Sequence, residues 1–208
     1  MKKIAITQRL IQNETYYEIR EALDINYCKL LDSCGFMPIV LPYEVNFEKY
    51  FNKFEINGLM LTGGNDLNVF NKNELSKKRD DYEKKILKFC IKKKIPVFGT
   101  CRGMQLIADF FGSTFKKIDG EVNSKSNLKI NKASIHAKLL SKFTTVNSYH
   151  NFSIDRISKN LLVSATNEKK IIKAIEHKTF KIFGQMWHAE RENKIDHNDI
   201  NLIKNFFK

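Results

Sequence analysis

The sequence predicts an α/β fold in which a mostly parallel central sheet is flanked by helices. Short apolar and β-branched runs alternate with helical patterns through the first hundred residues, and this alternation is typical of parallel sheets covered by helices. Two glycines, Gly63 and Gly64, follow one predicted strand, and the turn Gly99-x-Cys101-x-Gly103 joins another strand to a helix. Both turns therefore lie at the carboxyl ends of strands, where ligands bind in such folds.

The first half of the chain is predicted to contain four strands and four helices. Lys2–Thr7 is the first strand. A helix is predicted over residues 14–34, because its apolar positions recur at roughly helical spacing and Gly35 follows as a helix-ending glycine. Residues 67–79 are predicted to form a polar loop. The other strands are predicted over Met37–Leu41, Gly58–Leu61 and Ile95–Phe98, and the other helices over Phe47–Lys53, Asp80 to about Lys93, and Met104 to near Gly112.

The second half has a weaker pattern. Residues 114–142 combine turn-forming pairs with short apolar pieces, which predicts loops, short strands and a hairpin or two. Strands are then predicted over Leu161–Thr166, Lys170–Ile175 and Lys181–Glu190, followed by a closing helix over residues 198–207. A chain of 208 residues is long enough for one substantial core, so we expect a single domain over residues 1–208.

The composition indicates a globular protein, with 42% hydrophobic and 12% aromatic residues. The amino terminus lacks the apolar centre of a signal peptide, and no stretch approaches the length that crosses a bilayer. We therefore expect a cytoplasmic protein without a membrane partner. The four cysteines lie far apart without metal-ligand spacing, so we expect free thiols and no metal site.

The formal net charge of +13 raises the question of nucleic-acid binding. Lysines are spread along the whole chain, and no zinc finger, helix-turn-helix or aromatic-interleaved basic motif accompanies them. We therefore predict a Lys-rich solvated surface and no nucleic-acid partner. An acidic or phosphorylated small substrate would benefit from the positive field.

The turn at Cys101 has the features of a nucleophile elbow. An elbow holds its central residue in a strained conformation, and the glycines two residues before and after it avoid collisions with the neighbouring strand and helix. At the amino end of a helix, the helix dipole and free N–H groups favour the thiolate, which is the form that attacks a carbonyl carbon. The alternative is an ordinary buried cysteine in a glycine-containing turn.

Partners for such a thiol are found at two other strand ends. His188 and Glu190 are two residues apart, so in an extended chain both point to the same side, and the carboxylate can then orient the imidazole as a base. The loop at Gly63 and Gly64 can offer backbone N–H groups to an oxyanion. For the pair His188 and Glu190 taken alone, the alternative is a surface histidine that happens to lie near a glutamate. For Gly63 and Gly64 taken alone, the alternative is an ordinary turn.

Four ordered motifs resemble those of class I glutamine amidotransferases, and more closely those of the γ-glutamyl hydrolase branch, peptidase family C26. They are Gly63-Gly64-x-Asp66, Gly99-x-Cys101-x-Gly103-x-Gln105, Asn147-Ser148-x-His150 and Gln185-x-Trp187-His188-x-Glu190. The resemblance implies the flavodoxin-like fold of that class. It departs from the family at Ala189, where proline is common, and at the end of the elbow helix, residues 107–112.

The resemblance also implies roles for the site residues. Cys101 is the nucleophile, His188 the base and Glu190 its orienter. The backbone N–H groups of Gly64 and Arg102 hold the oxyanion. Substrate contacts are implied for Gly63, Gln105, Asn147, Ser148, Tyr149 and His150.

The implied reaction is hydrolysis of a γ-glutamyl amide through a γ-glutamyl thioester, with release of glutamate and without a cofactor. Overall likeness within the branch further implies a nucleotide-linked small molecule, γ-glutamyl-CDP-amidate, which gives cytidine diphosphoramidate for capsular polysaccharide modification. Arg102 and the segment Lys77–Arg79 are expected near its phosphates. No partner synthetase is then required.

Three alternatives stay open. The chain is a hydrolase of γ-glutamyl-γ-aminobutyrate, a glutaminase subunit that donates ammonia to a partner synthetase, or a catalytically idle binding protein on the same fold.

Overall fold

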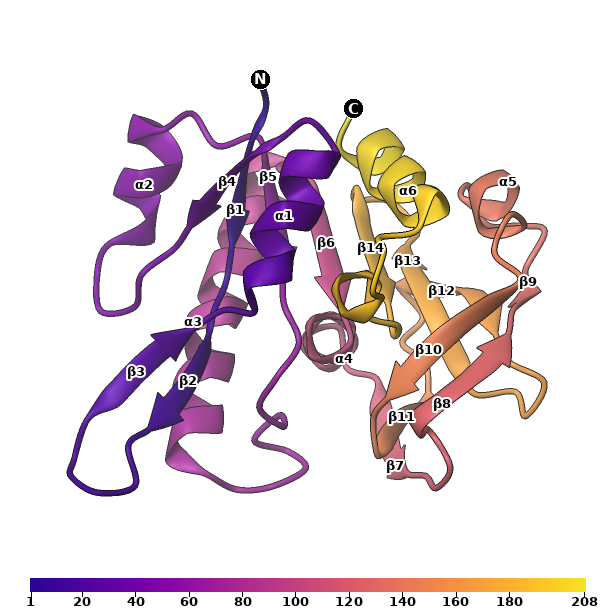
Figure 1. Ribbon diagram of the computed structural model, residues 1–208, viewed down its shortest axis with the longest axis horizontal. Helices are drawn as coiled ribbons and strands as arrows, with labels where there is room; N and C mark the ends of the chain where they lie inside the picture. Colours follow the sequence, from indigo (N-terminus) through magenta and orange to yellow (C-terminus); the bar gives the residue numbers. More distant parts are fainter.

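The computed structural model describes residues 1–208 and is built around one eight-stranded sheet (Figure 1). Five adjacent strands are parallel, and three further strands continue the sheet in antiparallel pairing. The mostly parallel sheet predicted from the sequence is thereby confirmed. In spatial order the strands are β4 (Met37–Val40), β1 (Lys3–Ile6), β5 (Gly58–Leu61), β6 (Val97–Thr100), β14 (Ile182–Gln185), β13 (Ile172–His177), β12 (Leu161–Thr166) and β9 (Lys129–Ile130).

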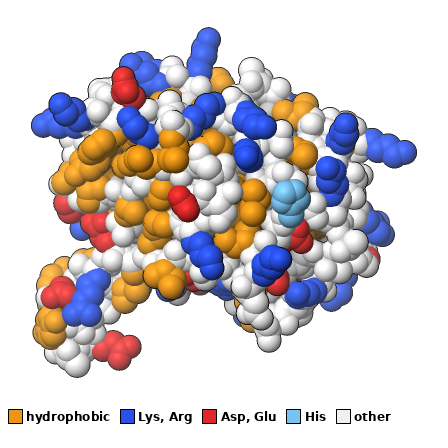
Figure 2. All heavy atoms as spheres, turned by 45° about the horizontal axis from the view of Figure 1, so that its top comes forward, with side chains coloured by type: hydrophobic (Ala, Val, Ile, Leu, Met, Phe, Trp, Pro, Cys, Tyr) orange, Lys and Arg blue, Asp and Glu red, His pale blue; other side chains and the backbone are white.

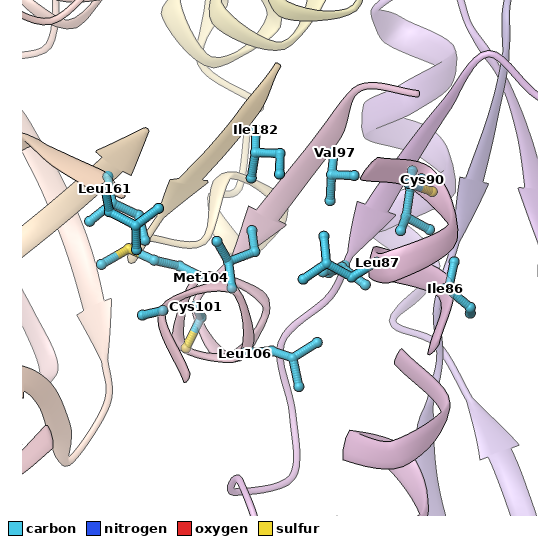
Figure 3. Packing of buried hydrophobic residues seen from close by; sticks show 14 of the residues in the cluster. Ile86, Leu87, Cys90, Val97, Cys101, Met104, Leu106, Leu161 and Ile182 are labelled. Atoms are coloured by element: carbon cyan, nitrogen blue, oxygen red, sulfur yellow. The ribbon is translucent and has the colours of Figure 1, made fainter. Parts of the chain in front are cut away.

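Helices cover both faces of the sheet. Successive side chains of a strand point to opposite faces: in β5, Leu59 and Leu61 join one core cluster and Met60 joins the other. The first cluster includes side chains of α2 (Phe47–Lys53), α3 (Glu74–Lys93) and α4 (Arg102–Phe110), and Figure 3 shows part of it. The second includes side chains of α1 (Ile25–Ser33), α5 (Ala137–Leu140) and the closing helix α6 (His197–Phe207).

The helix predicted over residues 14–34 is wrong in its first half. Residues 9–22 instead form an antiparallel hairpin of β2 (Arg9–Gln12) and β3 (Ile19–Ala22), which extends beyond the main sheet in Figure 1. Helix α1 begins only after Asp24, whose carboxylate accepts a hydrogen bond from the N–H of Asn26 at 2.9 Å. The predicted helix-ending glycine is confirmed, since Gly35 follows α1 with a φ of +78°.

The prediction of a polar loop over residues 67–79 is wrong for its second half, which is helical from Glu74 onward. Helix α3 begins at Glu74, because the side chain of Asn73 accepts hydrogen bonds from the N–H groups of Leu75 and Ser76 and so caps the first turn. The basic segment Lys77–Arg79 therefore lies on a helix rather than in a loop.

The hairpins predicted within residues 114–142 are also wrong. Short strands form there, but β7 (Thr114–Lys117) pairs with β11 (Phe152–Arg156), and β8 (Val122–Asn127) pairs with β10 (Thr145–Tyr149). These partners lie outside the segment, so its local turn signals do not select the pairing.

Lysine and arginine side chains are scattered over the face shown in Figure 2, among acidic and apolar ones, and do not form one basic patch there. None of the helices combines the length and the apolar character needed to cross a membrane.

Candidate active site

Cys101 lies between β6 and α4 in a strained backbone conformation, with φ of 51° and ψ of −105° (Figure 3). The flanking glycines permit this turn. A β-carbon on Gly99 would lie 2.6 Å from the carbonyl carbon of Gly103, and one on Gly103 would lie 2.2 Å from the carbonyl oxygen of Leu61. The nucleophile elbow predicted from the sequence is confirmed.

His188 and Glu190 meet although the strand before them is shorter than predicted. Strand β14 ends at Gln185, and Glu190 belongs to the short 3₁₀ helix η1 (Ala189–Arg191). The Nδ1 atom of His188 nevertheless lies 2.5 Å from Oε1 of Glu190, and both side chains are buried. The other ring nitrogen, Nε2, has no hydrogen-bond partner of normal geometry. His188 lines the same cavity as Cys101, so this nitrogen is available on the thiol side.

The charges around His188 favour its protonated form. Burial alone would lower the pKa of the imidazole, but the neighbouring Cys101, followed by the hydrogen bond and charge of Glu190, raises it to about 9. The arrangement therefore favours the imidazolium form of His188 near neutral pH, which can donate a proton to a leaving group.

Tyr27 is a site residue that the sequence analysis missed. Its hydroxyl accepts a hydrogen bond from the N–H of Gly63 at 3.1 Å, and burial together with the charge of Glu190 raises the pKa of the phenol well above its usual value. A β-carbon on Gly63 would lie 2.9 Å from Cε1 of His188, so the glycine permits close approach of the imidazole. Tyr27 lies 36 positions before Gly63, and no local pattern connects the two.

The backbone N–H groups of Gly64 and Arg102 are free at the cavity. The N–H of Gly64 has no acceptor within the protein, and the N–H of Arg102 belongs to the first turn of α4, where no intrahelical acceptor exists. Both residues line the cavity with Cys101. The loop and the elbow can therefore bind one negatively charged oxygen between them.

The cavity has a volume of about 270 Å³. Among the predicted substrate-contacting residues, Gln105, Tyr149 and His150 line it. Its full lining is Gly64, Asn65, Asp66, Cys101, Arg102, Gln105, Tyr149, His150, Asn151, Phe152, His188 and Arg191.

Asn147 and Ser148 do not line this cavity. The side chain of Asn147 instead fastens the backbone of His188, accepting from its N–H at 2.8 Å and donating to its carbonyl at 2.8 Å. The hydroxyl of Ser148 accepts a hydrogen bond from the buried ammonium of Lys173 at 2.5 Å. Asn147 therefore positions the backbone of His188, and Ser148 binds a buried residue outside the cavity lining.

His150 is held neutral in that wall. Burial, with the neighbouring ammonium of Lys173 as the second cause, lowers the pKa of His150 to about 4. The Nδ1 of His150 lies 3.1 Å from the carbonyl of Phe152, and Nε2 lies 3.3 Å from Nζ of Lys173. Because an ammonium has only donors, Nε2 is the acceptor and Nδ1–H the donor. The same Phe152 carbonyl accepts from Nε2 of Gln105 at 3.0 Å, which ties α4 to this wall.

The basic side chains of Arg102 and Lys77–Arg79, expected near the substrate phosphates, are all paired with carboxylates within the protein. The buried guanidinium of Arg102 is paired with Asp80 and Glu83. The other cations are also engaged: Arg79 pairs with Glu83 at 3.0 Å, Lys77 with Asp81 at 2.7 Å and Lys78 with Glu44 at 2.5 Å. Of these four residues only Arg102 lines the cavity, and its guanidinium is paired with two carboxylates of α3.

Comparison with known proteins agrees with this geometry. The family model of peptidase C26 matches residues 3–190. A γ-glutamyl-CDP-amidate hydrolase of Campylobacter jejuni is 39% identical in an alignment 208 positions long, which covers 98% of this chain and 96% of that protein.

Two solved structures share the fold. A Thermoplasma acidophilum protein described as one subunit of GMP synthase superposes with a TM-score of 0.75 at 19% identity, covering 100% of this chain and 92% of the other. A glutamine amidotransferase of Thermotoga maritima superposes with a TM-score of 0.67 at 18% identity, covering 98% and 83%. With its elbow cysteine, its glutamine amidotransferase fold and a family match over most of its length, the chain belongs to the peptidase C26 family and is a cysteine amidohydrolase.

Proposed function

We propose that Cys101, His188 and Glu190 hydrolyse a γ-glutamyl amide, and that the substrate is γ-glutamyl-CDP-amidate, cleaved to glutamate and cytidine diphosphoramidate. The observation that carries the catalytic proposal is the cavity that combines Cys101, His188 and two free backbone N–H groups. The substrate proposal is supported by the 39% identity, over nearly both full lengths, to the hydrolase of that name.

In the first step, the thiolate of Cys101 attacks the γ-carbonyl carbon and forms a C–S bond. The carbonyl oxygen becomes negatively charged and accepts hydrogen bonds from the N–H groups of Gly64 and Arg102. The C–N bond then breaks, and Nε2 of His188 donates its proton to the leaving nitrogen. The products of this step are cytidine diphosphoramidate and a γ-glutamyl thioester on Cys101.

In the second step, the now neutral His188 removes a proton from a water molecule, and the hydroxide attacks the thioester carbon. The C–S bond breaks, glutamate leaves, and the thiolate–imidazolium pair is restored. Glu190 holds the imidazole through Nδ1 in both steps.

The test is a comparison of glutamate release by the isolated chain from γ-glutamyl-CDP-amidate, γ-glutamyl-γ-aminobutyrate and glutamine. We expect the highest kcat/KM for the nucleotide compound. A higher value for the γ-aminobutyrate compound would replace the substrate proposal. Hydrolysis of glutamine that depends on an added synthetase would instead identify a glutaminase subunit.

A further inference from the structure

A diphosphate substrate needs cations near the catalytic thiol, and two arginines are placed to supply them. Of the six arginines in the chain, Arg79 and Arg102 are buried in ion pairs, Arg20 pairs with Glu18, and Arg156 lies on β11. The remaining two, Arg9 and Arg191, are exposed and lie at the edge of the active site.

We infer that Arg9 and Arg191 bind the diphosphate of the substrate on the leaving-group side of Cys101. This inference rests on the proposed function. Guanidinium groups suit the role because their fork of N–H donors matches phosphate oxygens in pairs.

Arg9 lies directly against the glycine loop. A β-carbon on Gly64 would lie 2.8 Å from Cδ of Arg9 and 3.2 Å from its Cβ, so the stem of the arginine packs on Gly64. Gly64 also lines the catalytic cavity. Arg9 forms no ion pair within the protein, so its charge is available to a ligand beside the proposed oxyanion donor.

Arg191 reaches the same edge from the other side. It lines both the catalytic cavity and a recess of about 30 Å³ that it shares with Arg9 and Gly64. Its guanidinium lies 4.6 Å from the ring centroid of Tyr149, and its Nε is 3.9 Å from Oε1 of Glu190, beyond hydrogen-bond distance. The group is therefore positioned by the aromatic ring and keeps its N–H donors for a ligand.

The direction of the reaction places the leaving group on this side. The nitrogen that accepts a proton from His188 must lie at that imidazole, and in the proposed substrate this nitrogen carries the phosphate. The ring of Tyr149 packs edge-on against His188, with centroids 5.7 Å apart, and Arg191 covers that ring. Tyr149 and Arg191 therefore follow His188 along one wall of the cavity.

The experiment compares the wild type with Arg9→Ala, Arg191→Ala and the matched surface variant Arg156→Ala. The kcat/KM values for γ-glutamyl-CDP-amidate and γ-glutamyl-p-nitroanilide are measured, together with the inhibition constant of CDP against the anilide. Each site variant should lower the ratio of nucleotide to anilide kcat/KM by about tenfold or more and raise the CDP constant comparably, because a charged hydrogen bond is lost. Arg156→Ala should leave both quantities at the wild-type values.

The outcomes separate this inference from the proposed function. An unchanged ratio in Arg9→Ala and Arg191→Ala overturns the inference, whether both activities are retained or both fall together. An equal fall would mean that these arginines hold the glutamyl carboxylate, common to both substrates, or the fold. If the wild type cleaves the anilide but neither cleaves the nucleotide compound nor is inhibited by CDP, the substrate proposal itself fails. Arg191→Lys provides a second check, since it keeps the charge and loses the fork, and it should lower the ratio less than Arg191→Ala.

Discussion

Cys101 differs from the other three cysteines by its surroundings. Burial raises the pKa of the thiols of Cys28 and Cys90, and it raises that of Cys34 to about 12, so these groups stay protonated. Cys101 alone lies beside an imidazole, at the start of a helix.

We therefore expect Cys101→Ala to lose turnover while keeping the fold, because the covalent route is removed. Glutamate release checks the activity and circular dichroism checks the fold. The alanine variants of the other cysteines serve as controls and should keep most of their activity. Residual turnover of Cys101→Ala above a few per cent of wild type would contradict the assignment.

Glu190 is expected to influence the pH dependence of kcat/KM, because it raises the pKa of His188. Its carboxylate raises the pKa of the imidazolium, which lies at about 9, so the active ion pair should be lost as the pH rises through that value. Replacing the charge by the neutral amide in Glu190→Gln should lower that pKa and move the alkaline limb of the kcat/KM profile to lower pH.

His188→Ala is the comparison for this prediction. It removes the proton donor itself, whereas Glu190→Gln removes only its orientation and charge, so the histidine variant should lose more activity. An alkaline limb that does not move in Glu190→Gln, or a glutamine variant that is the less active of the two, would mean that the roles are assigned incorrectly.

At the scale of elements, α3 supplies the carboxylates that pair with the buried arginines Arg79 and Arg102. The cap at Asn73 starts the helix at Glu74, six residues before Asp80, where the sequence predicted its start. This start places Arg79 and Asp80 within the helix, with Glu83 one turn later. There Glu83 pairs with Arg79, and Asp80 and Glu83 both pair with the side chain of Arg102.

Loss of this cap should destabilise the protein measurably. Asn73→Ala removes the acceptor of two N–H groups and should lower the free energy of unfolding by about 1 kcal/mol. Asn71→Ala is the control, because that residue is exposed and its side chain makes no hydrogen bond; it should change stability by less than about 0.5 kcal/mol. Urea denaturation of the three proteins gives the comparison, and equal midpoints would show that the cap has no energetic role.

At the scale of the whole molecule, the charge is large and spread out. The formal net charge is +13, and the face in Figure 2 shows basic side chains scattered among acidic and apolar ones. Such a field attracts anions in general, and salt screens it over about 10 Å at 0.1 M.

The KM for γ-glutamyl-CDP-amidate should therefore rise with ionic strength, since the diphosphate adds negative charge. The KM for γ-glutamyl-γ-aminobutyrate, which lacks phosphate, should rise much less. Steady-state kinetics at low and moderate salt measure both values. Parallel salt dependence of the two substrates would remove the electrostatic support for a nucleotide substrate.

The sequence by itself determined the features that need particular residues close together in the chain. Strands β5 and β6, the short helix α2 and the glycines of the elbow were predictable, because strand patterning and the strained turn at Cys101 each restrict the residue types at neighbouring positions. The ordered motifs also identified the histidine and glutamate partners, although the chain between His188 and Glu190 turns where an extended strand was expected.

Only the tertiary structure decided which residues pair across long distances. It joined β7 to β11, placed the hydroxyl of Tyr27 against Gly63, and paired the side chain of Arg102 with Asp80 and Glu83 while leaving Arg9 without an ion pair. A local sequence pattern indicates whether a segment favours a strand or a helix and which of its residues are charged. It does not indicate which distant strand or charged residue pairs with that segment, because this choice depends on how the whole chain packs.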